Sequence, residues 1–402
     1  MSEAGVGGDV LQSDHSFESA ARHRRRNRDG RFGEVRGEPG RGFEGRGAGV
    51  VVTRTWRGAV VGIGAVARNA HLPGWLACPE VEIAALYDPD VFCRVWADEN
   101  LPAAKWCGSL RELLATPHLD FVDVCAPPAS HRSIVAEALE AGVHVLCEKP
   151  LVSSVADFDL LTALADRKKR CLFTVHNWKH AEAVRRASKA IRTGFPGEER
   201  TCRWETIRTR PAGSTTDRAS WRTEAAAAEG GILLDHGWHS FYIVEEWLGG
   251  GPYSVRARFE CRAKDSKASG VEDTVRLELK GSEGRAEIFL TWAGTERKNT
   301  FVISGERGRI SACNDEWILE DFSRNERIRE TLADDLAGDS YHRKWFPGVI
   351  REFLSAMEGE GSRERNREEA RFCVSVLEAA RLSHQRGGEW ITRHRARTSA
   401  SS

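Results

Sequence analysis

The stretch Val60-Val61-Gly62-Ile63-Gly64-Ala65-Val66-Ala67 decides the fold of the first half of the chain. It has the form G-x-G-x-x-A and lies between an aliphatic run that predicts a strand and a segment that predicts a helix. The first glycine permits a tight turn, the second lets backbone amides approach a diphosphate, and the final small residue lets helix and strand pack closely. The stretch therefore predicts a dinucleotide-binding loop formed by Gly62, Ile63, Gly64, Ala65 and Val66.

Short aliphatic runs alternate with amphipathic segments after Arg57, which is the pattern of β-α-β units. The runs that predict strands are Ala59–Val61, Val81–Tyr87, Phe121–Cys125, His144–Cys147 and Cys171–Val175. Between them, Ser109–Thr116 begins with the capping pair Ser109 and Glu112, and His131–Ala141 has one apolar face. We therefore expect a Rossmann domain with a doubly wound parallel sheet over residues 56–176.

A different texture begins after about residue 198. Thr274–Leu279 and Ala286–Thr291 alternate apolar and polar residues, which favours an antiparallel sheet with one buried and one polar face. Trp345–Met357 and Glu368–His384 have helical spacing. We expect an α/β domain followed by an α+β domain over residues 177–392, with C-terminal helices that can pack back on the first domain.

The two ends of the chain lack the apolar pattern of a folded domain. Residues 1–55 are rich in Gly, Arg, Ser and Glu, and we expect a disordered tail or an over-extended gene start there. Arginines cluster between residues 22 and 28 and could form a nucleic-acid arm, but nearby acidic residues nearly cancel their charge. Residues 393–402 are expected to be a second disordered tail.

Composition argues for a small-molecule partner. The 59 basic and 59 acidic side chains balance, so neither nucleic acid nor an anionic membrane is an expected partner. The ten cysteines occur singly, which suits a reducing cytosol. No apolar run approaches the roughly 20 residues of a membrane span, and no signal peptide is visible, so we expect a cytoplasmic protein. No metal site is expected, because no third ligand accompanies either histidine pair, His236 with His239 or His176 with His180.

Asp88 ends the second predicted strand, about 20 residues beyond the glycine loop. A carboxylate at this place binds the adenosine ribose hydroxyls and repels a 2′-phosphate, which favours NAD over NADP. Asp88 could instead be a turn or capping aspartate before Pro89, and Arg68 could weaken the preference for NAD.

Lys149 lies in Cys147-Glu148-Lys149-Pro150, at the end of the fifth predicted strand. Ligands of doubly wound sheets collect at the carboxyl ends of the strands, so Lys149 is expected to face the nicotinamide crevice. The alternative is a solvated surface lysine in a loop.

Asp235 and His239 form a third constellation. If Asp235 opens a helix that runs to Trp247, the two side chains lie at positions i and i+4 on one face, where the carboxylate can orient the imidazole of a general base. The alternative makes Asp235 an N-cap and His239 a packing histidine.

Together these constellations resemble the glucose-fructose oxidoreductase, inositol dehydrogenase and rhizopine-catabolism family, Gfo/Idh/MocA. The resemblance runs from about Arg57 to Trp390 and includes Ala126-Pro127-Pro128-Ala-Ser-His131 and the segment Ala138–Pro150. It implies NAD(P) bound across the strand ends and an open, mainly antiparallel sheet that lines the substrate cleft and often forms an oligomer interface. Carried over by position, it implies cofactor contacts at Pro127, His131, Glu148 and Lys149, and catalytic roles for Lys149, Asp235 and His239.

Three departures from the family pattern leave the substrate open. The family's glycine triplet reads Glu229-Gly230-Gly231, its Asn-x-Arg-aromatic segment reads Asn177-Trp178-Lys179-His180, and Trp238 precedes the histidine. Indole faces stack on sugars and a lysine binds hydroxyls or phosphate, although core packing is an equal alternative for the tryptophans. The candidate substrate contacts are Asn177, Trp178, Lys179, Trp221, Asp235 and His239.

The resulting hypothesis is an NAD-dependent oxidoreductase that acts on a carbinol or ketone carbon of a sugar, sugar nucleotide or cyclitol. His239 would take the hydroxyl proton, Asp235 would hold the imidazole or the substrate hydroxyl, and Lys149 would stabilise alkoxide character. Imine reduction and NAD-assisted glycoside cleavage are alternatives within enzymes. A ligand sensor that binds NAD without turnover is the alternative from another class.

Overall fold

The computed structural model describes residues 54–213, 230–249, 252–263, 266, 270–359 and 361–393. Residues 1–53 of the first expected tail and residues 394–402 of the second are outside the described residues. The candidate substrate contact Trp221 and the glutamate of Glu229-Gly230-Gly231 are outside them as well.

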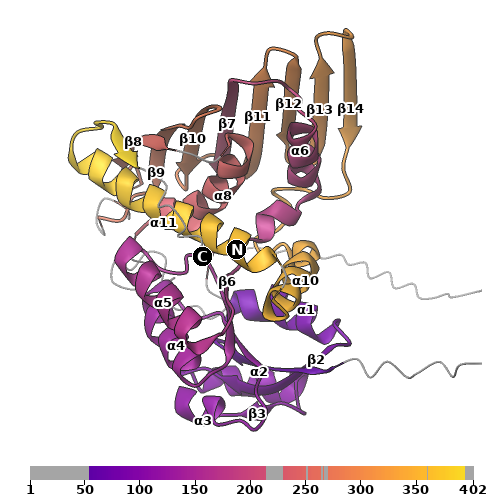
Figure 1. Ribbon diagram of the computed structural model, residues 1–402, viewed down its shortest axis with the longest axis vertical. Coiled ribbons are helices and arrows are strands. Elements are labelled where there is room, and N and C mark those ends of the chain that lie inside the picture. Colours follow the sequence, from indigo (N-terminus) through magenta and orange to yellow (C-terminus); the bar gives the residue numbers. More distant parts are fainter. Residues whose placement is uncertain are drawn as a thin grey trace, which may run out of the picture. The chain divides into compact units, whose positions relative to one another are not determined.

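A six-stranded parallel sheet forms the first layer of the fold (Figure 1). Its strands lie in the order β3-β2-β1-β4-β5-β6. The order reverses between β1 and β4, which is the switch point where doubly wound sheets bind ligands. All five predicted strands are present, and the short β3 is an addition. The strands are β1 Trp56–Val61, β2 Val81–Tyr87, β3 Lys105–Trp106, β4 Phe121–Val124, β5 His144–Cys147 and β6 Leu172–Thr174.

Helices bury both faces of this sheet, which explains why its strands read as continuous apolar runs. On one face, Val122 and Val145 belong to a core shared with α4 and α5; on the other, Phe121 packs with Trp75 and with Phe353 from the far end of the chain, at ring distances of 4.8 and 5.5 Å. The helices of this part are α1 Leu72–Leu76, α2 Phe92–Asn100, α3 Leu110–Leu114, α4 Pro128–Glu140, α5 Val155–Lys168 and α10 Phe346–Met357.

The capping pair predicted for α3 is present with one change of partner. The Ser109 hydroxyl accepts the Glu112 N–H at 3.1 Å, as expected. The Glu112 carboxylate accepts the N–H of Gly108 at 2.8 Å, one residue before the cap.

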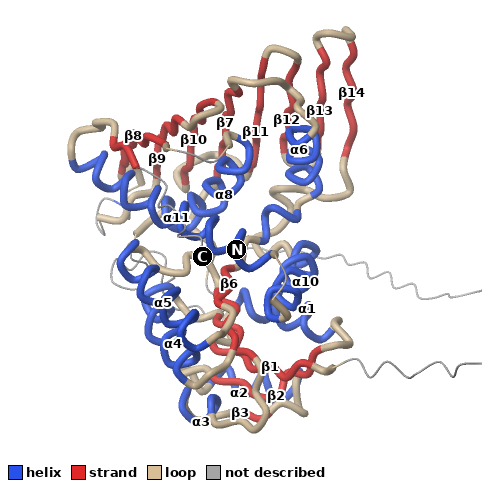
Figure 2. Tube along the Cα trace, viewed as in Figure 1, coloured by secondary structure: helices blue, strands red, loops and turns tan. Residues whose placement is uncertain are grey.

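A nine-stranded open sheet forms the second part, in the order β14-β13-β12-β11-β7-β10-β9-β8-β15 (Figure 2). Its pairs are antiparallel except β7 with β10, which run parallel, so the sheet is mixed but mainly antiparallel, as expected. The strands are β7 Arg200–Ile207, β8 Tyr253–Glu260, β9 Thr274–Lys280, β10 Gly284–Thr291, β11 Lys298–Gly305, β12 Gly308–Cys313, β13 Glu316–Asp321, β14 Glu326–Thr331 and β15 Ile391–Arg393.

Alternate residues of β7 are buried, because one face of the sheet is covered by α8 and α11 (Figure 1). The helices of this part are α6 Glu182–Arg192, α8 Trp238–Trp247 and α11 Ser362–Gln385. Arg203, Glu287 and Arg276 are exposed. No helix among the described residues is long and apolar enough to cross a membrane.

The helix α11 connects the second sheet to the first domain. It begins at Ser362, earlier than the expected Glu368. The Asn366 side chain pairs with the backbone N–H and carbonyl of Thr174 in β6, both at 2.8 Å, and Arg371 forms an ion pair with Asp159 of α5 at 2.5 Å.

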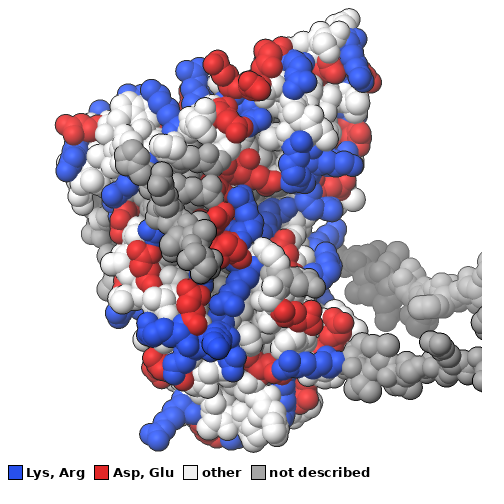
Figure 3. Space-filling view, viewed as in Figure 1, with Lys and Arg blue, Asp and Glu red and all other residues white. Residues whose placement is uncertain are grey.

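Lys and Arg side chains lie beside Asp and Glu side chains on the face of the molecule that Figure 3 shows.

Candidate active site

A cavity of about 860 Å³ lies at the carboxyl ends of the parallel strands and extends to the second sheet. The glycine loop, Asp88, Pro127 and the Glu148–Pro150 segment line it from the Rossmann side. Asn177, Trp178, Asp235 and His239 line it from the other side. Most of the predicted site residues therefore share one cavity.

The glycine loop has the shape that a dinucleotide requires. Gly62 has φ +89°, and a Cβ there would lie 2.7 Å from the Ala126 nitrogen, so only glycine fits. A Cβ at Gly64 would meet nothing within 4 Å, which leaves open space over the loop for a diphosphate. Ala67 is fully buried and begins a π-helical turn, Ala67–His71, that leads into α1. The residues present fit the diphosphate of NAD(P).

Asp88 holds the glycine loop while it lines the cavity. Its Oδ2 accepts the Ile63 N–H at 2.7 Å, and its Oδ1 accepts the Asp90 N–H at 2.8 Å. Arg68 donates from Nε to the Ile63 carbonyl at 2.7 Å, so Asp88 binds the N–H of Ile63 and Arg68 binds its carbonyl. The capping and ribose-binding interpretations of Asp88 are therefore compatible.

His131 joins the two loops below the cavity. Its Nδ1 lies 2.7 Å from the Pro150 carbonyl, and its Nε2 lies 2.8 Å from the Ala126 carbonyl. The ring is fully buried and outside the cavity lining, whereas Pro127 lies in the lining. The structure thus places His131 where it positions the loops rather than where it can touch a cofactor.

A buried charge network, not predicted from the sequence, supports the loop of Lys149. His71 lies 2.9 Å from Asp123 Oδ2 through Nδ1 and 2.9 Å from Glu148 Oε1 through Nε2, and Glu148 Oε2 accepts the Lys149 N–H at 2.9 Å. Burial alone would lower the pKa of His71, but Asp123 and Cys125 raise it well above its usual range. Burial would likewise raise the pKa of Glu148, but His71 lowers it. His71 is therefore an imidazolium between two carboxylates.

This network also contains the cluster of metal-ligand types found among the described residues, His71 with Asp123 and Cys125. Its groups bond to one another, with Cys125 Sγ 3.2 Å from His71 Nδ1. The Trp75 indole adds a hydrogen bond to Asp123 at 2.6 Å. Neither of the two histidine pairs seen in the sequence, His236 with His239 and His176 with His180, belongs to this cluster.

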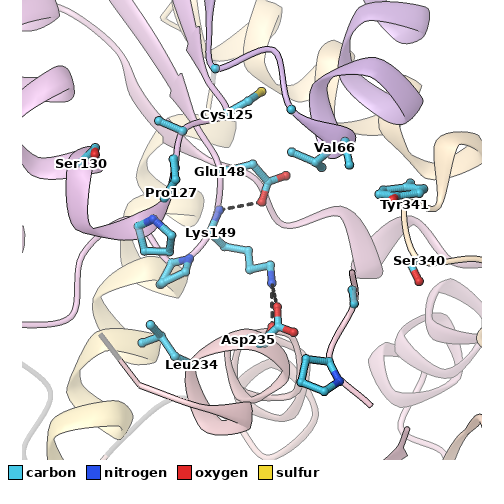
Figure 4. A pocket seen from close by; sticks show the side chains of 18 of the residues that line it. Val66, Cys125, Pro127, Ser130, Glu148, Lys149, Leu234, Asp235, Ser340 and Tyr341 are labelled. Carbon is cyan, nitrogen blue, oxygen red and sulfur yellow. Dashed lines mark hydrogen bonds and ion pairs between the residues drawn. The ribbon is translucent and has the colours of Figure 1, made fainter. Parts of the chain in front are cut away.

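Lys149 and Asp235 meet in the cavity, as Figure 4 shows. The Lys149 ammonium donates to the Asp235 backbone carbonyl at 2.6 Å and to its Oδ1 at 3.2 Å. The two side chains are only 12 and 9 % exposed, so water screens the pair weakly. His236 Nε2 lies 3.6 Å from the other carboxylate oxygen of Asp235.

Asp235 does not open its helix, contrary to the expectation. It lies inside a π-helical turn, Leu233–Gly237, that leads directly into α8. The carboxylate of Glu272 caps this turn from another segment, accepting the N–H of Gly231 at 2.8 Å and of Leu233 at 3.3 Å. A side chain at Gly231 would overlap the Glu272 backbone, so glycine is required there. π turns of this kind often occur at functional sites.

His239 is held by aromatic neighbours. It is stacked on Trp178 at a ring distance of 5.3 Å, and its Nδ1 lies 3.3 Å from the Tyr242 hydroxyl. That hydroxyl also accepts the Trp178 N–H at 3.0 Å and can donate its own proton to His239 Nδ1. This donation corresponds to the tautomer that carries its proton on Nε2. Burial, reinforced by Lys149 and His236, lowers the pKa of His239 well below 6.5, so the ring is neutral.

Lys179 lies apart from the other candidate substrate contacts. Its ammonium binds Glu352 at 2.7 Å and Glu369 at 3.3 Å, outside the cavity lining. Burial would lower its pKa, but these two carboxylates raise it. Lys179 thus neutralises the buried Glu369 and the half-buried Glu352, while Asn177 and Trp178 reach the cavity as expected.

Several cavity residues were not found from the sequence. The most prominent are Arg208, Trp292, Arg297 and His342. No local sequence motif identifies them as site residues, because they belong to segments that are far apart in the sequence and meet only in the folded structure.

Comparisons with known proteins agree with this architecture. Residues 56–176 match the family model "Oxidoreductase family, NAD-binding Rossmann fold", and residues 184–311 match the "GFO/IDH/MocA C-terminal domain". D-apiose dehydrogenase of Paraburkholderia graminis is 31% identical over 286 residues, which is 70% of this chain and 73% of that protein. Myo-inositol 2-dehydrogenase of Thermotoga maritima is 29% identical over 261 residues, which is 59% of this chain and 73% of that protein.

Among solved structures, GenD2 from gentamicin A biosynthesis, in complex with NAD, has the same fold, with a TM-score of 0.72 and 23% identity. The match covers 88% of this chain and 100% of that one. The chain belongs to the GFO/IDH/MocA family of NAD(P)-dependent oxidoreductases.

Proposed function

We propose that the protein uses NAD to interconvert a carbinol and a ketone in a sugar-like substrate, such as a sugar, a sugar nucleotide or a cyclitol. The observation that carries this proposal is the contact of Lys149 with Asp235, beside His239, in the cavity that begins at the glycine loop. The relatives named above act on a sugar and on a cyclitol, which supports the substrate class.

NAD supplies the acceptor or donor of the hydride when it is bound. The glycine loop would hold its diphosphate, and Asp88, Pro127 and Glu148 line the same cavity. Asp88 favours NAD over NADP, because its carboxylate, which accepts the N–H groups of Ile63 and Asp90, would repel a 2′-phosphate.

Lys149 is positioned to bind the reacting oxygen. An ammonium has three N–H donors, and Asp235 occupies two of them. The third can donate to the substrate oxygen and stabilise the negative charge that develops there in either direction of the reaction. Because Asp235 fixes the ammonium before substrate arrives, little reorganisation is required.

His239 would exchange the substrate proton through Nε2, which has no partner among the described residues. In the tautomer that carries its proton on Nε2, the ring donates to the oxygen, as polarisation of a ketone requires. To accept an alcohol proton at Nε2, the ring must hold its own proton on Nδ1, facing the Tyr242 hydroxyl oxygen. It then becomes an imidazolium, and ketone reduction would return the proton from this imidazolium to the substrate oxygen.

The test is a panel of polyols, sugars, keto-sugars and sugar nucleotides assayed with NAD⁺ and NADH at the absorbance band of reduced nicotinamide. The proposal expects turnover with members of this panel and a loss of about 10²- to 10⁴-fold in Lys149→Ala. Lys189→Ala, which removes an exposed lysine of α6, is the control and should be unaffected. Tight NAD binding without turnover across the panel would instead indicate a sensor.

A further inference from the structure

Three hydrogen-bond donors form a row where β7 meets its two neighbours. Ile207 pairs with Thr291 of the parallel β10 and with Lys298 of the antiparallel β11. One position further along, the row continues as Trp292, Arg208 and Arg297, and all three line the cavity. The Arg208 N–H donates to the Thr291 carbonyl at 2.8 Å, which keeps the register beyond the strand ends. We call these residues the donor row.

Arg208 uses only part of its guanidinium to hold the fold. Nη1 donates to the carbonyls of Ile207 and Lys298 at 2.8 and 3.2 Å, and Nη2 donates to Asn299 Oδ1 at 3.2 Å. Of the five N–H donors, Nε–H and one Nη2–H remain. Arg208 is only 4 % exposed, and among the described residues the one carboxylate that acts on its charge is Asp235, which Lys149 binds. A buried arginine edge of this kind is suited to binding an oxyanion with two parallel hydrogen bonds.

The other two members also have donors to spare. Arg297 donates from Nε to the Ala337 carbonyl at 2.6 Å and from Nη2 to the Asp339 carbonyl at 2.5 Å, which leaves both N–H groups of Nη1 and one of Nη2. Trp292 is 4 % exposed, and its Nε1–H has no acceptor among the described residues. A buried polar group without a partner in a ligand cavity is a reason to look for the ligand group that satisfies it.

Charge at this end of the cavity is positive. Among the described lining residues from the second sheet and its loops, Arg208, Arg210 and Arg297 face one acidic residue, Asp235, which Lys149 already binds. Burial lowers the pKa of Arg208 to about 10, and Arg297 adds to this effect. Burial lowers the pKa of His342 to about 3; Asp339 opposes this shift and Arg208 and Arg297 add to it, so this neighbour is neutral. An anionic group would be stabilised here.

We propose that the substrate carries an oxyanion, a carboxylate or a phosphate, which Arg208, Arg297 and the Trp292 indole N–H bind while Lys149 and His239 act on its carbinol or ketone carbon. The substrate class is then an acidic sugar derivative, such as an aldonate, a uronate or a sugar phosphate. This inference rests on the proposed function for the reaction, but the donor row itself can be tested by binding alone.

The experiment uses matched probes: neutral sugars and polyols, each with its carboxylate and its phosphate counterpart. Binding to the full-length protein with NAD⁺ is measured by calorimetry, and turnover is measured with NAD⁺ and NADH. We expect acidic members to bind and react in preference to their neutral counterparts, and the carboxylate and phosphate arms identify the group. Equal or better binding of the neutral members, or no binding by any acidic member, would overturn the proposal.

Variants separate local recognition from general charge. Arg297→Gln and Trp292→Phe should weaken binding of the preferred acid by about 10-fold or more, as expected for lost hydrogen bonds to a charged group, and leave NADH affinity unchanged. Arg203→Gln removes an exposed cation from the same region of sheet, where it pairs with Glu287, and should change neither. An equal effect of Arg203→Gln would mean that net charge, not the donor row, is responsible. If acids bind without turnover, the donor row stands and the proposed reaction fails.

Discussion

The two glycines of the dinucleotide loop should respond differently to the same added methyl group. At Gly62, alanine must adopt φ +89° and place its Cβ 2.7 Å from the Ala126 nitrogen and the Cys125 carbonyl carbon. Both neighbours are backbone atoms that cannot move aside as a flexible side chain can. A left-handed alanine costs about 1–2 kcal/mol and overpacking about 1–3 kcal/mol, so Gly62→Ala should lower the free energy of unfolding by about 2–5 kcal/mol.

At Gly64, the same methyl meets no atom within 4 Å. Gly64→Ala should therefore leave the free energy of unfolding unchanged or raise it by about 0.4–1 kcal/mol, because alanine restricts the unfolded chain. The methyl nevertheless occupies the space over the loop, so NADH affinity should fall by about 10-fold or more.

Urea unfolding and fluorescence titration with NADH, measured on both variants and the unmodified protein, separate the two effects. A Gly64→Ala variant that binds NADH normally would refute the assignment of this open space to the diphosphate. A Gly62→Ala variant of normal stability would refute the steric argument.

Three further predictions concern titration and cofactor choice. Burial, with Lys149 and His236, keeps the pKa of His239 well below 6.5, so kcat/KM should stay level as the pH falls from neutral to 6.5. A fall in kcat/KM on the acid side with its midpoint at pH 6.5 would count against a neutral His239. The raised pKa of His71 should contribute stability that is full below pH 6.5 and is lost as the pH rises through the pKa of His71 in the folded protein. Urea unfolding across pH should show this decline in the unmodified protein and not in His71→Gln, which should itself lose about 3–5 kcal/mol of unfolding free energy. The same dependence of stability on pH in both proteins would disprove the charged network. Asp88→Ser should shift the ratio of NADPH to NADH affinity by roughly fivefold or more toward NADPH, since like charges about 4 Å apart repel by about 1 kcal/mol even in water. An unchanged ratio would show that Asp88 does not determine the choice between NAD and NADP.

The parallel sheet could be predicted because its strands are buried on both faces and read as aliphatic runs. Lys105–Trp106 escaped prediction because two residues carry no periodicity. The glycine loop and Lys149 could be found from local motifs, since a β-α-β unit fixes where a strand end and its following loop lie. The start of the helix at Asp235 was wrong, because Glu272, from a distant segment, caps the preceding turn.

Long-range contacts explain what sequence reasoning missed in the site. Lys179 was expected at the substrate, but Glu352 and Glu369, far along the chain, hold its ammonium elsewhere. Arg208 and Trp292 carry no motif, and only the parallel pairing of β7 with β10 places them side by side. Such pairings depend on tertiary packing that local periodicity does not encode.

The most direct test of the central claim is the rate of hydride transfer in a single turnover, followed by stopped-flow absorbance of reduced nicotinamide with a substrate from the panel. Lys149→Ala and His239→Ala should each slow this step by about 10²- to 10⁴-fold, which is far more than they lower NADH affinity. Hydride transfer at the normal rate in either variant would show that Lys149 and His239 do not act together at the bound nicotinamide.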